Sequence, residues 1–71
     1  MGGKNMKVKK NNYVSVDDQC IIRLIKNGVK TVNNKFKVSK GTNREDGFVE
    51  LETIPRKMFV NAEEIVYVWD E

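Results

Sequence analysis

The apolar residues of this chain come in short runs, and this pattern constrains its fold more than any other feature. The runs are rich in Val, Ile, Phe and Tyr, and Asn, Gly and Asp separate them. β-Branched and aromatic residues favour strands, whereas Asn, Gly and Asp favour turns. The pattern predicts an all-β fold, a small five- to six-stranded antiparallel barrel or rolled sheet. The expected strands lie near 6–9, 13–16, 20–25, 29–39, 48–53, 57–60 and 65–69.

The length and the cysteine count define how such a fold can be stabilised. A chain of 71 residues has room for one small domain. One Cys and no His exclude both an internal disulfide and a zinc site of the usual Cys/His kind. We expect a single β domain over 11–71, preceded by a basic and partly disordered arm over 1–10. The lone thiol suits a reducing compartment. Because no signal peptide or apolar span is recognisable, the sequence predicts a cytoplasmic protein without membrane contact.

Charge is divided unevenly along the chain. Residues 1–44 carry eleven positive and two negative side chains, which gives a net charge of +9. Residues 45–71 carry two positive and eight negative side chains, which gives −6. This division predicts either a basic surface for an anionic partner or two halves that attract each other. Frequent Lys and Asn, whose codons are AT-rich, are typical of a low-GC genome or its phage.

Two hairpins can be assigned a register. The first is expected to turn at 26–28 with Gly28 left-handed, which places Ile22 opposite Val32. The second is expected to turn through 41–46, with apolar pairs on one face and lysine–glutamate pairs on the other. Its expected pairs are Val38 with Val49, Phe36 with Leu51, Lys37 with Glu50, and Lys35 with Glu52. These pairs would explain part of the charge division within the fold.

One short helical turn is expected near 61–64, because Asn61 and Glu64 have the spacing of a capping box. A strand, one tight turn and a closing strand resemble the end of small SH3-like barrels. The apolar run 58–60 followed by 65–68 also resembles the second motif of Sm-like proteins, and 25–28 resembles the turn of their first motif. This resemblance implies a small β-barrel. Asn61-Ala62 stands where that family carries an Arg-Gly pair.

No residue pattern typical of catalysis is present. Without His the classical triads are excluded, and Cys20 has no His to activate it. The adjacent carboxylates at 17–18, 45–46 and 63–64 are typical of turns and caps. We therefore expect no enzymatic activity, no cofactor, no metal and no small-molecule substrate.

Two binding functions remain open. Several expected strands are apolar on both faces, which favours protein contact or self-assembly by a non-catalytic module. The expected partner interface consists of Ile21, Ile25, Phe59, Val66, Val68 and Trp69. The alternative is binding of single-stranded RNA or DNA, because lysines neutralise phosphates and aromatic rings stack on bases. Its expected residues are Lys7, Lys9, Lys10, Tyr13, Arg23, Lys30 and Arg44, with Lys35, Lys37 and Lys40 as further candidates.

Overall fold

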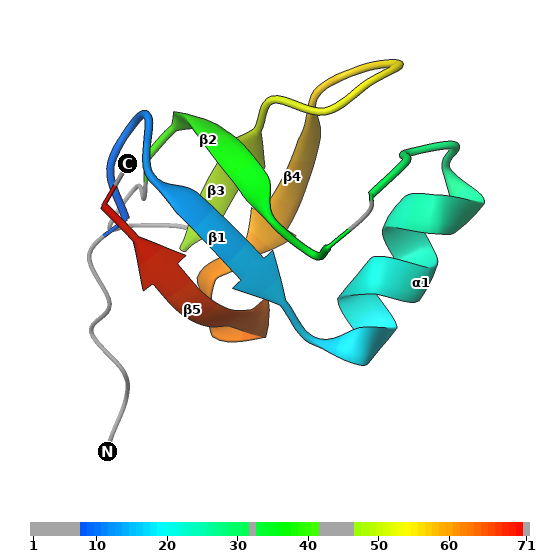
Figure 1. Ribbon diagram of the computed structural model, residues 1–71, viewed down its shortest axis with the longest axis horizontal. Helices are drawn as coiled ribbons and strands as arrows, with labels where there is room; N and C mark the ends of the chain where they lie inside the picture. Colours follow the sequence, from blue (N-terminus) through cyan, green and yellow to red (C-terminus); the bar gives the residue numbers. More distant parts are fainter. Residues whose placement is uncertain (1–7, 32, 42–46, 71) are drawn as a thin grey trace.

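The computed structural model describes residues 8–31, 33–41 and 47–70. Five antiparallel strands form one rolled sheet in the order β4-β3-β2-β1-β5 (Figure 1). A 3-10 turn, η1, joins β4 to β5, and a helix, α1, lies between β1 and β2. The all-β rolled sheet is confirmed, and β4 and β5 are its two open edges. The elements are β1 (Tyr13–Val16), α1 (Asp18–Lys26), β2 (Phe36–Lys40), β3 (Phe48–Leu51), β4 (Met58–Asn61), η1 (Ala62–Glu64) and β5 (Ile65–Trp69).

Helix α1 has a defined beginning and end. Asp17 caps its N-terminus, because its side chain accepts a hydrogen bond from the Cys20 N–H at 2.9 Å. Beyond Asn27, Gly28 adopts the left-handed conformation at φ +87°, as is common after helix C-termini. Cys20 and Leu24 lie one turn apart, and both are fully buried. The helix therefore packs one narrow face on the sheet.

The strand predicted over 20–25 is wrong, and so is the first hairpin. That hairpin would place Ile22 in an apolar layer, whereas Ile22 is 55% exposed on α1. The left-handed Gly28 is confirmed, but it ends a helix instead of turning a hairpin. The strand predicted over 29–39 begins only at Phe36.

The second hairpin forms with a different register. Val38 lies opposite Leu51, and Lys40 lies opposite Glu50, with a bulge between Val38 and Lys40. The four predicted pairs are therefore wrong, because the connection is longer than expected and Ser39 is inserted in β2. The shift at Val38 is two residues, so the apolar side chains at 36 and 38 keep their predicted face. The inward residues Phe36, Val38, Val49 and Leu51 are all buried.

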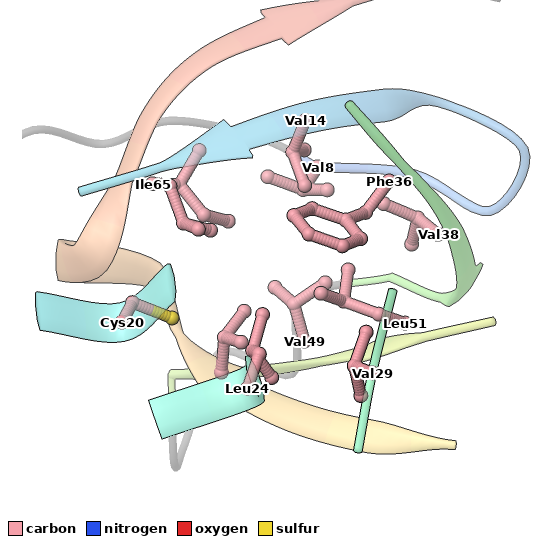
Figure 2. Packing of buried hydrophobic residues seen from close by; sticks show 12 residues of the cluster. Val8, Val14, Cys20, Leu24, Val29, Phe36, Val38, Val49, Leu51 and Ile65 are labelled. Carbon is pink, nitrogen blue, oxygen red and sulfur yellow. The ribbon is translucent and has the colours of Figure 1, made fainter. Parts of the chain in front are cut away.

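The core lies between the concave side of the sheet and α1. Figure 2 shows Cys20 and Leu24 from the helix pointing toward Val49 and Ile65 from the strands. Leu24, Val49 and Val60 are fully buried. The buried cluster consists of Val8, Val14, Val16, Cys20, Leu24, Val29, Phe36, Val38, Val49, Leu51, Val60 and Ile65.

The N-terminal arm and the short helical turn can now be located. Residues 1–7 lie outside the described residues, and with them most of the predicted arm and half of the strand predicted at 6–9. Val8 belongs to the core, but it does not form a strand. The predicted turn near 61–64 is confirmed as η1, and both hydrogen bonds of the capping box between Asn61 and Glu64 are present. In the described part, no helix has the length and apolar character needed to cross a membrane.

Candidate functional site

The register of β1 against β5, which are neighbouring strands in Figure 1, places aromatic residues on the outward face of the sheet, opposite the buried Val14. Tyr13 on β1 pairs with Trp69 on β5, and Ser15 pairs with Tyr67. On its other side, Tyr13 pairs with Lys37 on β2. The ring centroids of Tyr67 and Trp69 are 4.8 Å apart with an interplanar angle of 66°, an edge-to-face arrangement. Three neighbouring strands therefore present aromatic and basic residues on one face.

Lys35 brings a positive charge onto these rings. Its Nζ lies 4.8 Å from the ring centroid of Trp69 and 5.5 Å from that of Tyr13. An ammonium group at this distance is attracted by the negative face of an aromatic ring. We call Tyr13, Lys35, Tyr67 and Trp69 together the stacking surface.

A bulge in β5 places the aromatic residues on this face. The register of β5 against β1 shifts by one residue, and Val66 is the extra residue. Strict alternation would give Ile65, Tyr67 and Trp69 the same face. Instead Ile65 is buried in the core, whereas Tyr67 is 55% exposed. The bulge thus lets Ile65 point into the core while Tyr67 and Trp69 point outward.

Asn34 fixes the chain just before Lys35. It is left-handed at φ +54°. Its Nδ2 donates a hydrogen bond to the Val16 carbonyl at 2.8 Å, and its Oδ1 accepts one from the Val16 N–H at 3.0 Å. The amide side chain thus takes the place of a neighbouring strand at the end of β1. Because Lys35 follows directly, these bonds hold its backbone beside β1.

Within the described residues, neither Lys35 nor the lysines of β2 form ion pairs. The one ion pair in the described part of the chain joins α1 to η1. Glu50, the predicted partner of Lys37, instead accepts a hydrogen bond from Ser39 Oγ at 2.9 Å. The observed register brings Glu52 beside Lys37 through a backbone hydrogen bond of 2.8 Å, and it removes the predicted pairing of Glu52 with Lys35. Carboxylates therefore lie beside Lys37 and opposite Lys40, but within the described residues neither lysine forms an ion pair.

A groove of about 410 Å³ lies between β2, the segment after α1 and the β3–β4 connection. Three lysines and one glutamate line it, which makes its formal charge positive. Ile54, which is 79% exposed, and Pro55 form an apolar wall. The lining residues are Gly28, Lys30, Lys35, Phe36, Lys37, Glu52, Thr53, Ile54 and Pro55. Because Lys35 also lies over the aromatic rings, the groove continues the stacking surface.

The ion pair between α1 and η1 has a different character. The Arg23 guanidinium donates hydrogen bonds to both carboxylate oxygens of Glu64, at 3.0 and 3.2 Å, and one to the Phe59 carbonyl at 3.5 Å. The bond from Arg23, aided by one from the Asn61 N–H, holds the pKa of Glu64 below its ordinary value despite partial burial. This pair closes α1 onto η1 and β4.

Cys20 offers no reactive thiol. Burial, reinforced by the negative charge of Glu64, raises the pKa of Cys20 to about 11. A thiol with such a pKa stays protonated near neutral pH, and a protonated thiol is a poor nucleophile. In the described residues, no three His, Cys, Asp or Glu side chains lie close enough together to hold a metal ion.

The residues predicted for nucleic-acid binding occupy several places. Tyr13 belongs to the stacking surface, and Lys30 lines the groove. Lys9 and Lys10 are exposed before β1, whereas Arg23 is engaged by Glu64. Two members of the predicted set, Lys7 and Arg44, lie outside the described residues.

The residues predicted for a partner interface come from three elements. Ile25 on α1, Phe59 on β4 and Val66 on β5 are each more than half exposed. Ile21 and Val68 are partly buried against the core. The sixth member, Trp69, is half-buried within the stacking surface.

Sequence reasoning missed that Tyr67 and Trp69 join Tyr13. The signal was present in part, since Tyr67 and Trp69 are spaced by two in an apparent strand. The pairing of β5 with β1 was the missing information. Comparisons of this chain with protein-family models, with curated proteins and with solved structures found no match.

Proposed function

We propose that this chain is a non-catalytic module that binds single-stranded nucleic acid on its stacking surface. One observation carries the proposal: Lys35 Nζ lies 4.8 Å from the ring of Trp69 and 5.5 Å from that of Tyr13, in no ion pair with a described carboxylate. Proteins that bind single strands combine aromatic rings, on which bases stack, with cations that attract the backbone. Both elements meet here on one face.

The register of β2 against β3 supports nucleic-acid binding over protein contact as the first candidate function. From the sequence alone, the expected lysine–glutamate pairs explain part of the charge division without an external partner. The observed register leaves Lys35 and Lys37 without those partners. Glu52 now lies beside Lys37, but neither lysine forms an ion pair with a described carboxylate. Both can therefore attract the phosphates of an external ligand, the main source of affinity in non-specific nucleic-acid binding.

A fluorescence titration tests the proposal. Trp69 is the only tryptophan, so its emission reports on the stacking surface. We expect single-stranded oligonucleotides to quench this emission, with an affinity that falls as the salt concentration rises. Tyr67→Ala should weaken binding by about 1–3 kcal/mol, the usual contribution of one stacked base. Phe59→Ala is the matched control, because Phe59 is similarly exposed but lies on β4.

Two results would contradict the proposal. One is emission that does not respond to any oligonucleotide at low salt. The other is equal weakening by Tyr67→Ala and Phe59→Ala, since that would show that an exposed aromatic residue on any face suffices.

Protein contact or self-assembly is the second candidate function, and the β4 edge favours it. Phe59 is 57% exposed on this edge strand, and Phe48 is 46% exposed on β3 beside it. An exposed edge with large apolar side chains can pair with another chain. Sedimentation tests this candidate: self-assembly predicts a mass above 8.2 kDa that returns to the monomer value in Phe59→Lys. A wild-type chain that is monomeric at every concentration contradicts self-assembly.

We further propose that the fold is a relative of the Sm-like and SH3-like small barrels and that the protein acts in the cytoplasm. The 3-10 turn between β4 and β5 supports the first statement, because such a turn precedes the last strand of small SH3-like barrels. The buried, unpaired thiol of Cys20 supports the second, because it suits a reducing compartment.

A further inference from the structure

The groove beside β2 has a chemistry that stacking of bases does not use. Lys30, Lys35 and Lys37 line it with one opposing carboxylate, that of Glu52. None of these lysines forms an ion pair within the described part of the chain. Three lysines and one glutamate along its walls give the groove a positive formal charge, which attracts an anion.

We propose that this groove is the subsite for the phosphodiester backbone of the single strand whose bases stack on Tyr67 and Trp69. The inference rests on the proposed function and adds the course that the bound strand takes over the surface. The strand would run from the β5 edge across β1 to the groove, with Lys35 at the junction. Lys35 carries this assignment, because it lines the groove and also places its Nζ over the rings of Tyr13 and Trp69.

The walls of the groove fit a sugar–phosphate backbone better than an acidic peptide. Lysine ammonium groups bind phosphate as point charges on flexible stems, without the fixed geometry of a bidentate carboxylate contact. Ile54 and Pro55 supply an apolar wall against which a sugar ring can pack. Aromatic rings next to the cations suit a ligand in which flat bases alternate with charged groups.

Substitution of the groove lysines tests the inference. Lys30→Gln removes one charge from an exposed position, so the fold is retained, and circular dichroism verifies this. Lys26→Gln is the matched control, because Lys26 is exposed on the last turn of α1 and does not line the groove. Binding of an oligothymidylate is measured by Trp69 quenching at several salt concentrations for both variants and for Lys37→Gln.

The slope of log affinity against log salt gives the result. For a single strand, each lost phosphate contact lowers the steepness of this slope by roughly 0.7. We expect that loss in Lys30→Gln and in Lys37→Gln, about twice that loss in the double variant, and none in Lys26→Gln. Quenching at saturation should stay at the wild-type value, because the bases still stack on Trp69.

The outcomes separate this inference from the proposed function. If wild type binds and the slopes of Lys30→Gln and Lys26→Gln are equal, the phosphate subsite is wrong while the stacking surface stands. If wild type does not bind the oligonucleotide, both are wrong. If polyglutamate of matched charge displaces the oligonucleotide as well as unlabelled oligonucleotide does, the groove binds acidic peptide instead, and the assignment to a nucleic-acid backbone is overturned.

Discussion

Arg23 and Lys35 are both basic, yet the molecule uses them in opposite ways. Arg23 donates two hydrogen bonds to Glu64 at 3.0 and 3.2 Å, so its charge is neutralised by Glu64 and holds α1 against η1. Lys35 has no carboxylate partner in the described residues, and its Nζ lies over the rings of Tyr13 and Trp69. A count of charges along the sequence treats the two alike. The contacts distinguish them, and only the second kind leaves charge for a ligand.

The regions around Arg23 and Lys35 differ in the same way. The α1–η1 region contains a capped helix, a capping box and a bidentate ion pair, which all serve stability. The stacking surface contains the exposed ring of Tyr67, two half-buried rings and Lys35, which forms no ion pair within the described residues. These side chains contribute less to stability and suit a ligand. Substitutions in the first region should therefore change the free energy of unfolding, and substitutions in the second should change binding.

Leu24→Ala should have the largest effect and should act on stability. Leu24 is fully buried between α1 and the sheet, so its truncation leaves a cavity and costs roughly 2–5 kcal/mol. Urea unfolding, followed by circular dichroism, measures the loss. If Leu24→Ala costs less than about 1 kcal/mol, α1 does not pack on the core as described.

Trp69→Ala should act mainly on binding. The loss of one stacking ring should weaken oligonucleotide binding by about 1–3 kcal/mol, roughly fivefold to 150-fold. Anisotropy of a labelled oligonucleotide measures this, because the variant lacks the tryptophan signal. Trp69→Phe keeps a ring and should recover most of the affinity. If Trp69→Ala binds as tightly as wild type, the stacking surface does not bind the oligonucleotide, and the proposed difference between the two regions is wrong.

Lys35→Gln should have a smaller effect, again on binding. The lost positive charge no longer attracts a phosphate, so we expect a few-fold weaker binding. The lost cation–π contact lies within the fold and is exposed, so the free energy of unfolding should fall by no more than about 0.5–1 kcal/mol. Lys35→Arg keeps the positive charge over the rings and serves as the control. A stability loss in Lys35→Gln without any change of affinity would show that Lys35 is structural, as Arg23 is.

Glu64→Gln should have the smallest effect, and its pH dependence identifies its cause. The amide keeps the capping-box hydrogen bond but loses the charge that faces Arg23. Because this pair is partly exposed, we expect a loss below about 1 kcal/mol at pH 7. The pKa of Glu64 is lowered in the fold from its ordinary 4.5, so its stabilisation is complete above that pH and disappears as pH falls through the folded value. Wild type and variant should therefore converge in acid, whereas a constant difference would exclude the ion pair as the cause.

The strands and the 3-10 turn were predictable because local chemistry determines them. Three short runs rich in β-branched and aromatic residues became β1, β4 and β5, and the spacing of Asn61 and Glu64 gave η1. Helix α1 was missed because Ile21, Ile22 and Ile25 give the run a strand-like composition. A capping residue at 17 and the spacing of the buried residues 20 and 24 were the opposing signals.

The candidate site was less predictable because it depends on pairing between distant residues. The bulge at Val66 brings Ile65 inward and leaves Tyr67 and Trp69 outward, and no local pattern indicates it. The insertion at Ser39 changes which side chains lie opposite Lys37. Bulges move side chains without changing composition, so a prediction that assumes regular ladders pairs the wrong charges.

Amide chemical shifts of the 15N-labelled protein, recorded during titration with a single-stranded oligonucleotide, test the central claim most directly. We expect the largest changes at Tyr13, Lys35, Tyr67 and the Trp69 indole N–H, with the α1–η1 region unchanged. Changes confined to α1 or to Phe59 on β4, or no changes at saturating oligonucleotide and low salt, would contradict the claim that the stacking surface binds nucleic acid.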